Sequence, residues 1–428
     1  MSDPAKVTPI GAKKSKPRPS ADWVSLVAYT EKGRPRATLA NAIAILGSHP
    51  DWEKVLARDL FSDETIKLQP APTRAEDTPI DARCGVWSGT DSARTVGWLS
   101  SAADLDVSTS VVDEAVEVVA ERAAFHPVRN YLRSLEWDGV PRITTWLSTY
   151  FGAEPSRYVQ AIGARWLISA VARVMQPGCQ ADCMLILESN RQGIGKSTGI
   201  EILAGSEWFA DSGLDLGNKD SYQCLRGKWI YEWPELDSLK GRETSRVKAF
   251  VGARVDNYRP SYARRNRDFP RQCVFIGTTN ESSYLHDGTG NRRFWPIRCS
   301  DRDVDRDAIR AVRDQLWAEA LEWYADGKAW YVDTTELRAM CEAEQADREV
   351  QDPWVGYART WAHSRMGQGL TTEELLRDGL ALDAGKVNRQ YEIRAGQVLR
   401  ALGFGDRRRV RTGGGTREWR YFWTGGEA

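Results

Sequence analysis

The chain has 428 residues, of which 41% are hydrophobic and 28% charged, the balance of a folded, water-soluble protein with two or three domains. No apolar stretch reaches the roughly 18 residues that a membrane-spanning helix needs. Residues 1–20 lack the apolar core of a signal peptide, so the sequence predicts a cytoplasmic protein.

The net charge is zero, but the charges are segregated along the chain. Residues 1–20 hold five basic side chains and one acidic, and residues 388–428 hold nine arginines and four acids. A neutral protein with basic ends can still bind a polyanion, because binding responds to the local field. The cysteines are scattered and histidines are few, which favours reduced thiols over a zinc site.

Residues 1–20 are proline-rich and lack aromatics, so we expect a disordered basic leader. Residues 21–125 form an N-terminal domain of unknown role, with a helix over residues 37–46 and a Pro/Thr-rich loop over residues 68–82. No constellation of chemically active residues stands out there.

Residues 126–330 read as an α/β domain. A helical lead-in and a helix over residues 156–175 precede strands over residues 183–188, 228–232 and 273–277. These strands alternate with helices over residues 196–204, 243–252 and 305–327.

Residues 331–366 are expected to form a helical connector. Residues 367–428 predict helices over residues 372–379 and 393–402, then a hairpin around the glycines at 413–415. This order suggests a winged-helix-like domain that binds DNA or protein.

The most informative segment is MLILESNRQGIGKSTGIEILAG, in which an apolar strand runs through a glycine turn into a helix. This is the pattern of a P-loop, whose backbone amides cradle phosphates while the lysine reaches the β/γ oxygens and the hydroxyl binds Mg²⁺. The alternative is a glycine turn before a core helix. The residues assigned to ATP are Asn190, Gln192, Gly193, Ile194, Gly195, Lys196, Ser197 and Thr198. Asn190 stands where the first glycine is usual, and asparagine tolerates left-handed backbone.

The second strand ends in an acid, Glu232, and a second acid, Glu235, follows three residues later. We assign Glu232 to Mg²⁺, together with Ser197, and to the attacking water, and Glu235 as a second acid, with their order open. Ordinary solvated acids at a strand end are the alternative.

Asn280 ends the third strand, where an amide can position water or sense the γ-phosphate. Arg292 and Arg293 follow a glycine turn. Either is a candidate arginine finger for a neighbouring subunit, and on their own they equally suit surface ion pairs.

Together, QGIGKST, WIYEWPEL, VKAFVGARVDNYRPSYARR, FPRQCVFIGTTN and GTGNRRFWPI resemble the virulence-associated protein E family. That family looks like a branch of the superfamily-three helicases, AAA+ ATPases of phages and mobile elements. The resemblance implies a Walker A motif at 193–197, Walker B at Glu232 with Glu235, sensor 1 at Asn280 and a finger at Arg292 or Arg293. It also implies a ring, usually a hexamer, in which neighbours share ATP sites.

The resemblance further implies a β-hairpin at residues 258–272 that grips single-stranded DNA in the ring channel. Its arginines suit the backbone, and Tyr258, Tyr262 and Phe269 suit base stacking. A solvated basic loop is the alternative. The hairpin arginines are Arg259, Arg264, Arg265, Arg267 and Arg271.

These predictions describe an ATP-dependent DNA helicase, an ATP hydrolase for replication of a phage or mobile element. In the C-terminal domain, duplex phosphates would be contacted by Arg407, Arg408, Arg409, Arg411 and Arg417. The competing hypothesis is a non-catalytic replication initiator that uses ATP as an assembly switch. A primase–helicase is disfavoured because Asp81, Asp91 and Asp104 are too scattered for two-metal chemistry.

Overall fold

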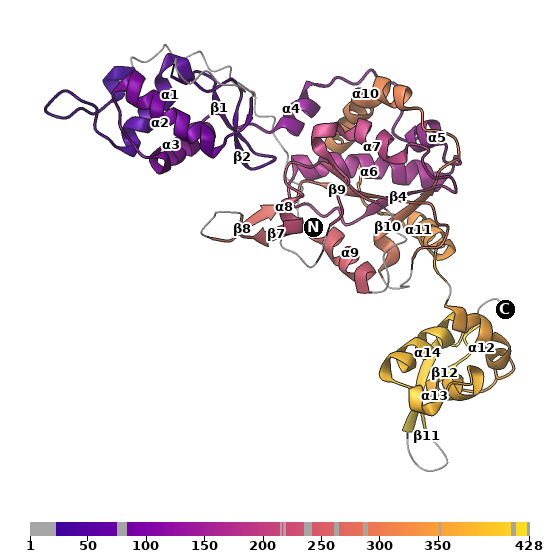
Figure 1. Cartoon of the computed structure of the whole chain (residues 1–428). Coiled ribbons are helices and arrows are strands. Elements are labelled where there is room, and N and C mark those ends of the chain that lie inside the picture. Colours follow the sequence, from indigo (N-terminus) through magenta and orange to yellow (C-terminus); the bar gives the residue numbers. More distant parts are fainter. Residues whose placement is uncertain are drawn as a thin grey trace, which may run out of the picture. The chain divides into compact units, whose positions relative to one another are not determined.

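The structure is a computed structural model that describes residues 23–74, 84–214, 216, 220–234, 242–260, 265–285, 290–350, 352–411 and 417–425 (Figure 1). The expected basic leader lies outside these residues. The chain divides into two compact units. The first comprises Met1–Leu236, Arg246–Asn280 and Arg293–Cys341, and the second comprises Asp237–Ser245, Glu281–Arg292 and Glu342–Ala428.

The N-terminal part of the first unit packs helices against a small antiparallel sheet of order β1-β2-β3. Ser88 forms a capping box with Asp91, whose carboxylate also pairs with Lys67, so Asp91 has a structural role. The predicted helix over residues 37–46 is confirmed as α1, whereas the strands and later helices were not predicted. The elements are η1 (Trp23–Leu26), α1 (Leu39–Ser48), η2 (Pro50–Trp52), β1 (Leu56–Asp59), β2 (Glu64–Lys67), β3 (Gly85–Val86), α2 (Gly89–Ala103) and α3 (Thr109–Glu121).

The centre of the first unit is a five-stranded, all-parallel sheet of order β10-β4-β9-β6-β5. Every residue of β4, β6 and β9 is buried, as expected for a parallel sheet covered on both faces. Three of its strands were predicted. The strands are β4 (Met184–Glu188), β5 (Phe209–Ala210), β6 (Ile230–Trp233), β9 (Val274–Thr279) and β10 (Phe294–Arg298).

Helices cover this sheet, with α6, α7 and α10 on one side and α9 on the other (Figure 1). Buried indoles fix the layers, since Trp166 donates to the Phe275 carbonyl at 3.0 Å and Trp317 to the Leu203 carbonyl at 2.8 Å. The four helices predicted for this region are confirmed. The elements are α4 (Pro127–Ser134), α5 (Trp146–Phe151), α6 (Arg157–Met175), α7 (Lys196–Ala204), η3 (Ser206–Trp208), α8 (Asp220–Gln223), α9 (Arg242–Gly252), η5 (Asn291–Arg293), α10 (Arg306–Ala325) and α11 (Thr335–Asp347).

A separate antiparallel pair, β7 (Val255–Tyr258) and β8 (Arg267–Pro270), lies between α9 and β9 in the chain. Its register pairs Val255 with Pro270 and Tyr258 with Arg267. This is the position at which a β-hairpin was expected.

The C-terminal part of the second unit has its own core around Leu375, Leu399, Phe404 and Tyr421. The predicted helices and the paired strands are present, while the glycine tip lies outside the described residues. The elements are α12 (Pro353–His363), α13 (Thr372–Glu374), a π-turn over Leu375–Gly379, η7 (Ala384–Lys386), α14 (Arg389–Ala401), β11 (Asp406–Arg411) and β12 (Arg417–Phe422).

The fold is therefore a mixed α/β architecture with a central parallel sheet and many helices. Among the helices described, none combines the length and the apolarity needed to cross a bilayer.

Candidate nucleotide site

The loop from β4 to α7 opens at the carboxyl edge of the sheet. Gly193 and Gly195 have φ angles of 76° and 91°, the left-handed region that glycine adopts freely. A Cβ on Gly195 would lie 3.1 Å from the Arg306 guanidinium, so a larger residue would also require that side chain to shift. The N-terminus of α7, which begins at Lys196, therefore remains open to an anion.

A cavity of about 340 Å³ lies over this loop. Of the residues expected to bind ATP, only Asn190 is not part of its wall, and Asn280 joins them. Four lining residues were not predicted to belong to the site: Pro234, Thr278, Thr279 and Arg306.

The carboxylate of Glu232 accepts hydrogen bonds from two hydroxyl groups. Ser197 Oγ and Thr278 Oγ1 each donate to Glu232 Oε1 over 2.6 Å. Burial raises the pKa of Glu232, and the two donated hydrogen bonds act in the opposite direction. The other oxygen, Oε2, is buried and has no hydrogen-bond partner among the residues described. Carboxylate and hydroxyl oxygens are the kinds of ligand that a hard cation prefers.

Lys196 is buried and points at two side chains. Its Nζ donates to Ser189 Oγ and, over 3.1 Å, to Asn280 Oδ1. Burial lowers the pKa of Lys196, since removal from water disfavours the charged form. Strand β9 lies directly between β4 and β6, and this order brings Asn280 and Glu232 to the loop.

Asn190 is held in a different way from that expected. Its φ is not positive, so tolerance of left-handed backbone does not explain the asparagine. Instead, the backbone amides of Asn190 and Arg191 both donate to Asp301 Oδ1, at 3.0 and 3.1 Å. Asp301 follows β10 and anchors the start of the loop.

Arg306 is the first residue of α10 and lines the cavity. Within the described part of the chain its guanidinium forms no ion pair. No local motif marks Arg306, because only the packing of α10 on α7 brings it to the loop.

Among the other described residues predicted for the ATP site, Glu232, Arg292 and Arg293 are not part of the cavity wall. Glu235 lies outside the described residues. Arg293 is half-buried beside Gly252, with its Nε buried and unpartnered among the residues described. Arg292 is exposed on the 3₁₀ turn η5.

The β7–β8 pair corrects part of the expected DNA-binding set. Arg271 is buried and pairs with Asp256 at 2.7 Å, so it anchors the strands rather than facing a ligand. Tyr258 is only 3% exposed and stacks on Phe269 at 4.6 Å, which leaves Tyr258 unavailable to a base. Arg259, Arg265 and Arg267 are exposed as expected, whereas Tyr262 and Arg264 lie outside the described residues.

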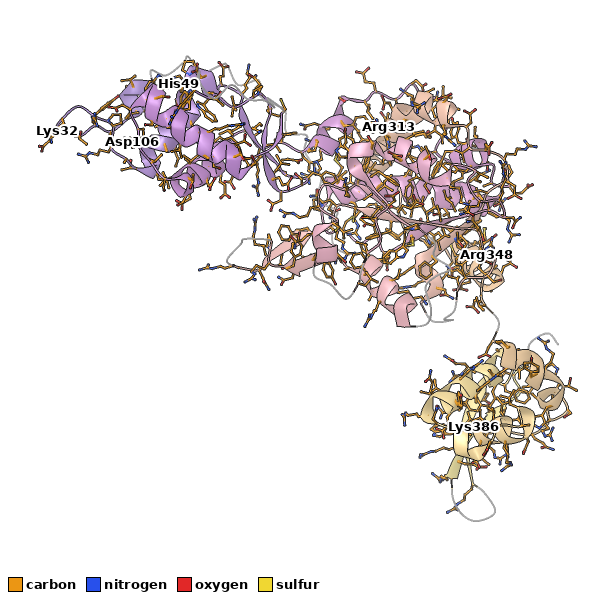
Figure 2. All side chains as sticks on the ribbon, viewed as in Figure 1. Lys32, His49, Asp106, Arg313, Arg348 and Lys386 are labelled. Carbon is orange, nitrogen blue, oxygen red and sulfur yellow. The ribbon has the colours of Figure 1, made fainter. Side chains whose placement is uncertain are left out.

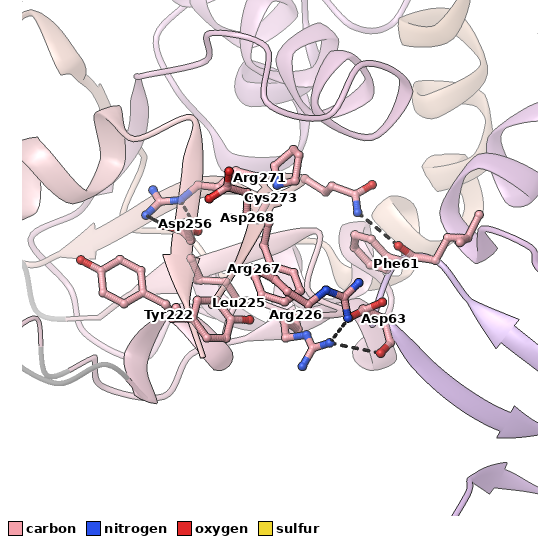
Figure 3. Close-up of a pocket in the computed structure, with 15 residues that line it drawn as sticks. Phe61, Asp63, Tyr222, Leu225, Arg226, Asp256, Arg267, Asp268, Arg271 and Cys273 are labelled. Carbon is pink, nitrogen blue, oxygen red and sulfur yellow. Dashed lines mark hydrogen bonds and ion pairs between the residues drawn. The ribbon is translucent and has the colours of Figure 1, made fainter. Parts of the chain in front are cut away.

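Beside this pair, Asp63, Arg226 and Arg267 line a pocket of about 220 Å³ (Figure 3), and Arg58 also pairs with Asp63. Arg226 Nη2 lies 2.6 Å and Arg267 Nη1 3.3 Å from Asp63 Oδ2, and Arg58 pairs with the other carboxylate oxygen. Asp63 sits on the β1–β2 turn at a φ of 55°. No local sequence motif marks this cluster, because its members come from distant segments.

The chain is similar in structure to proteins that have been solved. Three solved structures of the NrS-1 C-terminal region, all in the apo state, are 12–13% identical, with TM-scores of 0.44, 0.45 and 0.42. Each alignment covers 86% of this chain and 96% of that structure. No curated protein matches the chain.

A model of the virulence-associated protein E-like domain matches residues 132–350. The match includes the glycine loop, Glu232 and Asn280 and spans more than half of the sequence. The chain therefore belongs to the family of proteins with a virulence-associated protein E-like domain.

Proposed function

We propose that the chain is an ATP-dependent DNA helicase whose motor is a P-loop ATPase of the AAA+ type. The observation that carries the proposal is the contact between Ser197 Oγ and Glu232 Oε1, with Lys196 and Asn280 bonded beside it. Lys196 and Ser197 begin α7 after the loop from β4, Glu232 lies on β6, and Asn280 directly follows β9. The family membership and this cluster are the basis for proposing a role in replication of a phage or mobile element.

The topology supports a nucleotide at this edge. Ligands of open parallel sheets bind outside the carboxyl ends of the strands. Here β4 leads into the glycine loop, Asn280 directly follows β9, and β6 carries Glu232. Backbone amides at the start of α7 would bind phosphate oxygens, and Lys196 would exchange Ser189 and Asn280 for them.

The site fits Mg²⁺. Glu232 Oε2 and Ser197 Oγ are oxygen donors of the kind that Mg²⁺ prefers, and it usually completes its shell with substrate phosphates and water. When bound, the ion neutralises charge on the phosphates. No group of three His, Cys, Asp or Glu side chains suited to a metal occurs among the residues described, so the phosphates would supply ligands here.

The residues of the chain then have separate tasks. Lys196 binds the β/γ oxygens, Asn280 orients the attacking water, and Glu232 holds the ion. Glu235 is proposed as the second acid. Arg306, charged and without an ion pair in the described chain, is positioned at the same cavity to contact the nucleotide.

We further propose a ring, usually a hexamer, in which one subunit supplies an arginine to the next. Arg292 suits this task better than Arg293, since Arg292 is exposed and Arg293 is half-buried. Single-stranded DNA would contact Arg259, Arg265 and Arg267 on the β7–β8 pair, with Arg264 and Tyr262 between them in the sequence.

The test is ATP hydrolysis with and without single-stranded DNA, across a series of protein concentrations. We expect turnover stimulated by DNA, with a steep dependence on protein concentration because sites are shared. Lys196→Ala and Glu232→Gln should each abolish it, while Lys328→Ala, at an exposed site, should not.

Turnover that is absent, or unaffected by DNA and by both variants, would contradict the motor. The ATP-switched replication initiator would then be the better description of the chain.

A further inference from the structure

The C-terminal hairpin has two chemically different faces. Strand residues alternate between faces, and the register pairs Arg407 with Tyr421, Arg409 with Trp419 and Arg411 with Arg417. These six residues therefore share one face. The opposite face carries Asp406, Arg408, Val410, Glu418, Arg420 and Phe422.

The second of these faces is neutralised internally. Arg408 forms an ion pair with Asp406. Arg420 pairs with Glu418 at 2.5 Å and with Glu374 of α13 at 3.1 Å. Its two arginines are thus balanced by its own two acids, before Glu374 is counted.

The first face, which we call the basic face, carries only positive charge. Its arginines, Arg407, Arg409, Arg411 and Arg417, are all exposed. Within the described residues, none of the four forms an ion pair. Four adjacent cations repel one another, so a bound anion would stabilise this face.

An indole holds two of these arginines in place. Trp419 is 44% exposed, and the guanidinium carbons of Arg407 and Arg409 lie 4.5 and 5.2 Å from its ring centroid. Cation–π contacts restrict the rotamers of the two arginines before any ligand binds. Less side-chain entropy is then lost on binding. Because guanidinium groups lie over the ring, the indole positions the arginines rather than offering itself to a nucleobase.

The positive charge continues onto the neighbouring helix. Arg400 of α14 is exposed, and its guanidinium lies 5.7 Å from the ring of Tyr421. The guanidinium of Arg407 lies 5.5 Å from the same ring. The hairpin projects from the helices of its unit (Figure 1), and its basic face is exposed at the four arginines and Trp419 but buried at Tyr421, which packs in the core.

We propose that the basic face binds the phosphate backbone of duplex DNA without reading its sequence. Successive arginines on one strand are about 6.8 Å apart, a spacing that presents a row of charges to a row of phosphates. Single-stranded DNA would call for aromatic faces left open for stacking, which Trp419 does not offer. The proposal is independent of ATP hydrolysis and of the β7–β8 pair.

The experiment measures binding of the full chain to a fluorescent duplex between about 50 and 200 mM salt, where phosphate contacts change affinity most visibly. Arg409→Ala should reduce the slope of log affinity against log salt by about 0.9, the value for one phosphate contact. Its matched control is Arg408→Ala, one residue away on the neutralised face, which should leave the slope unchanged. Replacing all four basic-face arginines by Gln should reduce the slope by about 3.6.

The tryptophan provides a second, independent variant. Trp419→Leu should weaken duplex binding severalfold with little change in salt slope, and Trp419→Phe should restore most of the affinity. An equal loss in Arg408→Ala and Arg409→Ala would overturn the assignment of the face. So would a four-arginine variant with the wild-type slope, which would direct attention to a protein partner.

Two further arms separate this proposal from the proposed ATPase. Lys196→Ala should bind duplex as the wild type does, even if it no longer hydrolyses ATP. The four-arginine variant should keep its affinity for single-stranded DNA. A parallel loss of single-strand affinity would contradict a duplex-specific face.

Discussion

The hydroxyl of Ser197 donates to Glu232 Oε1 over 2.6 Å and so joins the first turn of α7 to β6, two strands away in the sheet. The contact joins Ser197, at the cavity wall, to the buried Glu232, 35 positions later in the chain. Its chemistry leads to the first prediction.

Ser197→Ala removes the hydroxyl but leaves Thr278 bonded to Glu232. We expect ATP turnover to require at least tenfold more Mg²⁺, because one proposed ligand of the ion is lost. A Mg²⁺ titration of ATPase activity measures this, with Ser197→Thr as the control that retains an oxygen. An unchanged Mg²⁺ requirement in Ser197→Ala would exclude Ser197 as a ligand.

The pH dependence of stability should report Glu232. Its pKa in the folded chain lies above the usual 4.5, because burial disfavours the carboxylate. As the pH rises through 4.5, the unfolded chain therefore releases this proton before the folded chain does, and the folded state loses stability. Glu232→Gln removes this loss, so the melting temperature of the variant relative to wild type should increase from pH 4 to pH 7. A constant difference across that range would contradict the raised pKa.

Arg306→Ala should weaken binding of a non-hydrolysable ATP analogue by about tenfold, the effect of losing one charge-assisted hydrogen bond. Folding should be unaffected, since Arg306 has no ion pair in the described chain to lose. Titration calorimetry measures the affinity. Arg310→Ala, one turn later on α10 and exposed, is the matched control and should bind as wild type does.

Asp63→Asn should destabilise the contact between the β1–β2 turn and β8. Three arginines would lose their shared carboxylate, and for this partly exposed cluster we expect about 1–2 kcal/mol in urea unfolding. Hydrogen exchange should increase in Val255–Tyr258 and Arg267–Pro270. Asp307→Asn disrupts an exposed pair with Arg310 and serves as the control, with an expected change below about 0.5 kcal/mol. Equal changes in the free energy of unfolding for the two variants would show that the Asp63 cluster contributes no more than an exposed ion pair.

The local part of the candidate site was predictable from sequence. Strand β4, the glycine turn and helix α7 follow one another within a short stretch, and the helix begins and ends at the residues expected, 196 and 204. The positions of Glu232 and Asn280 followed from the rule that parallel strands end at one edge of the sheet.

The rest depends on contacts between distant segments. Strand β10 contains Pro296, which the sequence pattern disfavours in a strand but an edge position tolerates. Without β10, neither Asp301 nor Arg306 could be placed beside the loop. The strands of the N-terminal part are two to four residues long, too short for a periodic signal, so Asp63 was not recognised.

Strand β9 has a mechanical consequence. One end leads directly into Asn280, which accepts a hydrogen bond from Lys196 at the candidate nucleotide site. The other end follows Arg271, the buried anchor of β8. All six residues of β9 are buried, and Phe275, Ile276 and Gly277 pair with both β4 and β6, so β9 resists bending. A bound nucleotide that draws Lys196 away from Asn280 would act at one end of β9. The other end of this strand is covalently connected to the β7–β8 pair, so β9 would link the proposed ATP site to the proposed DNA contacts.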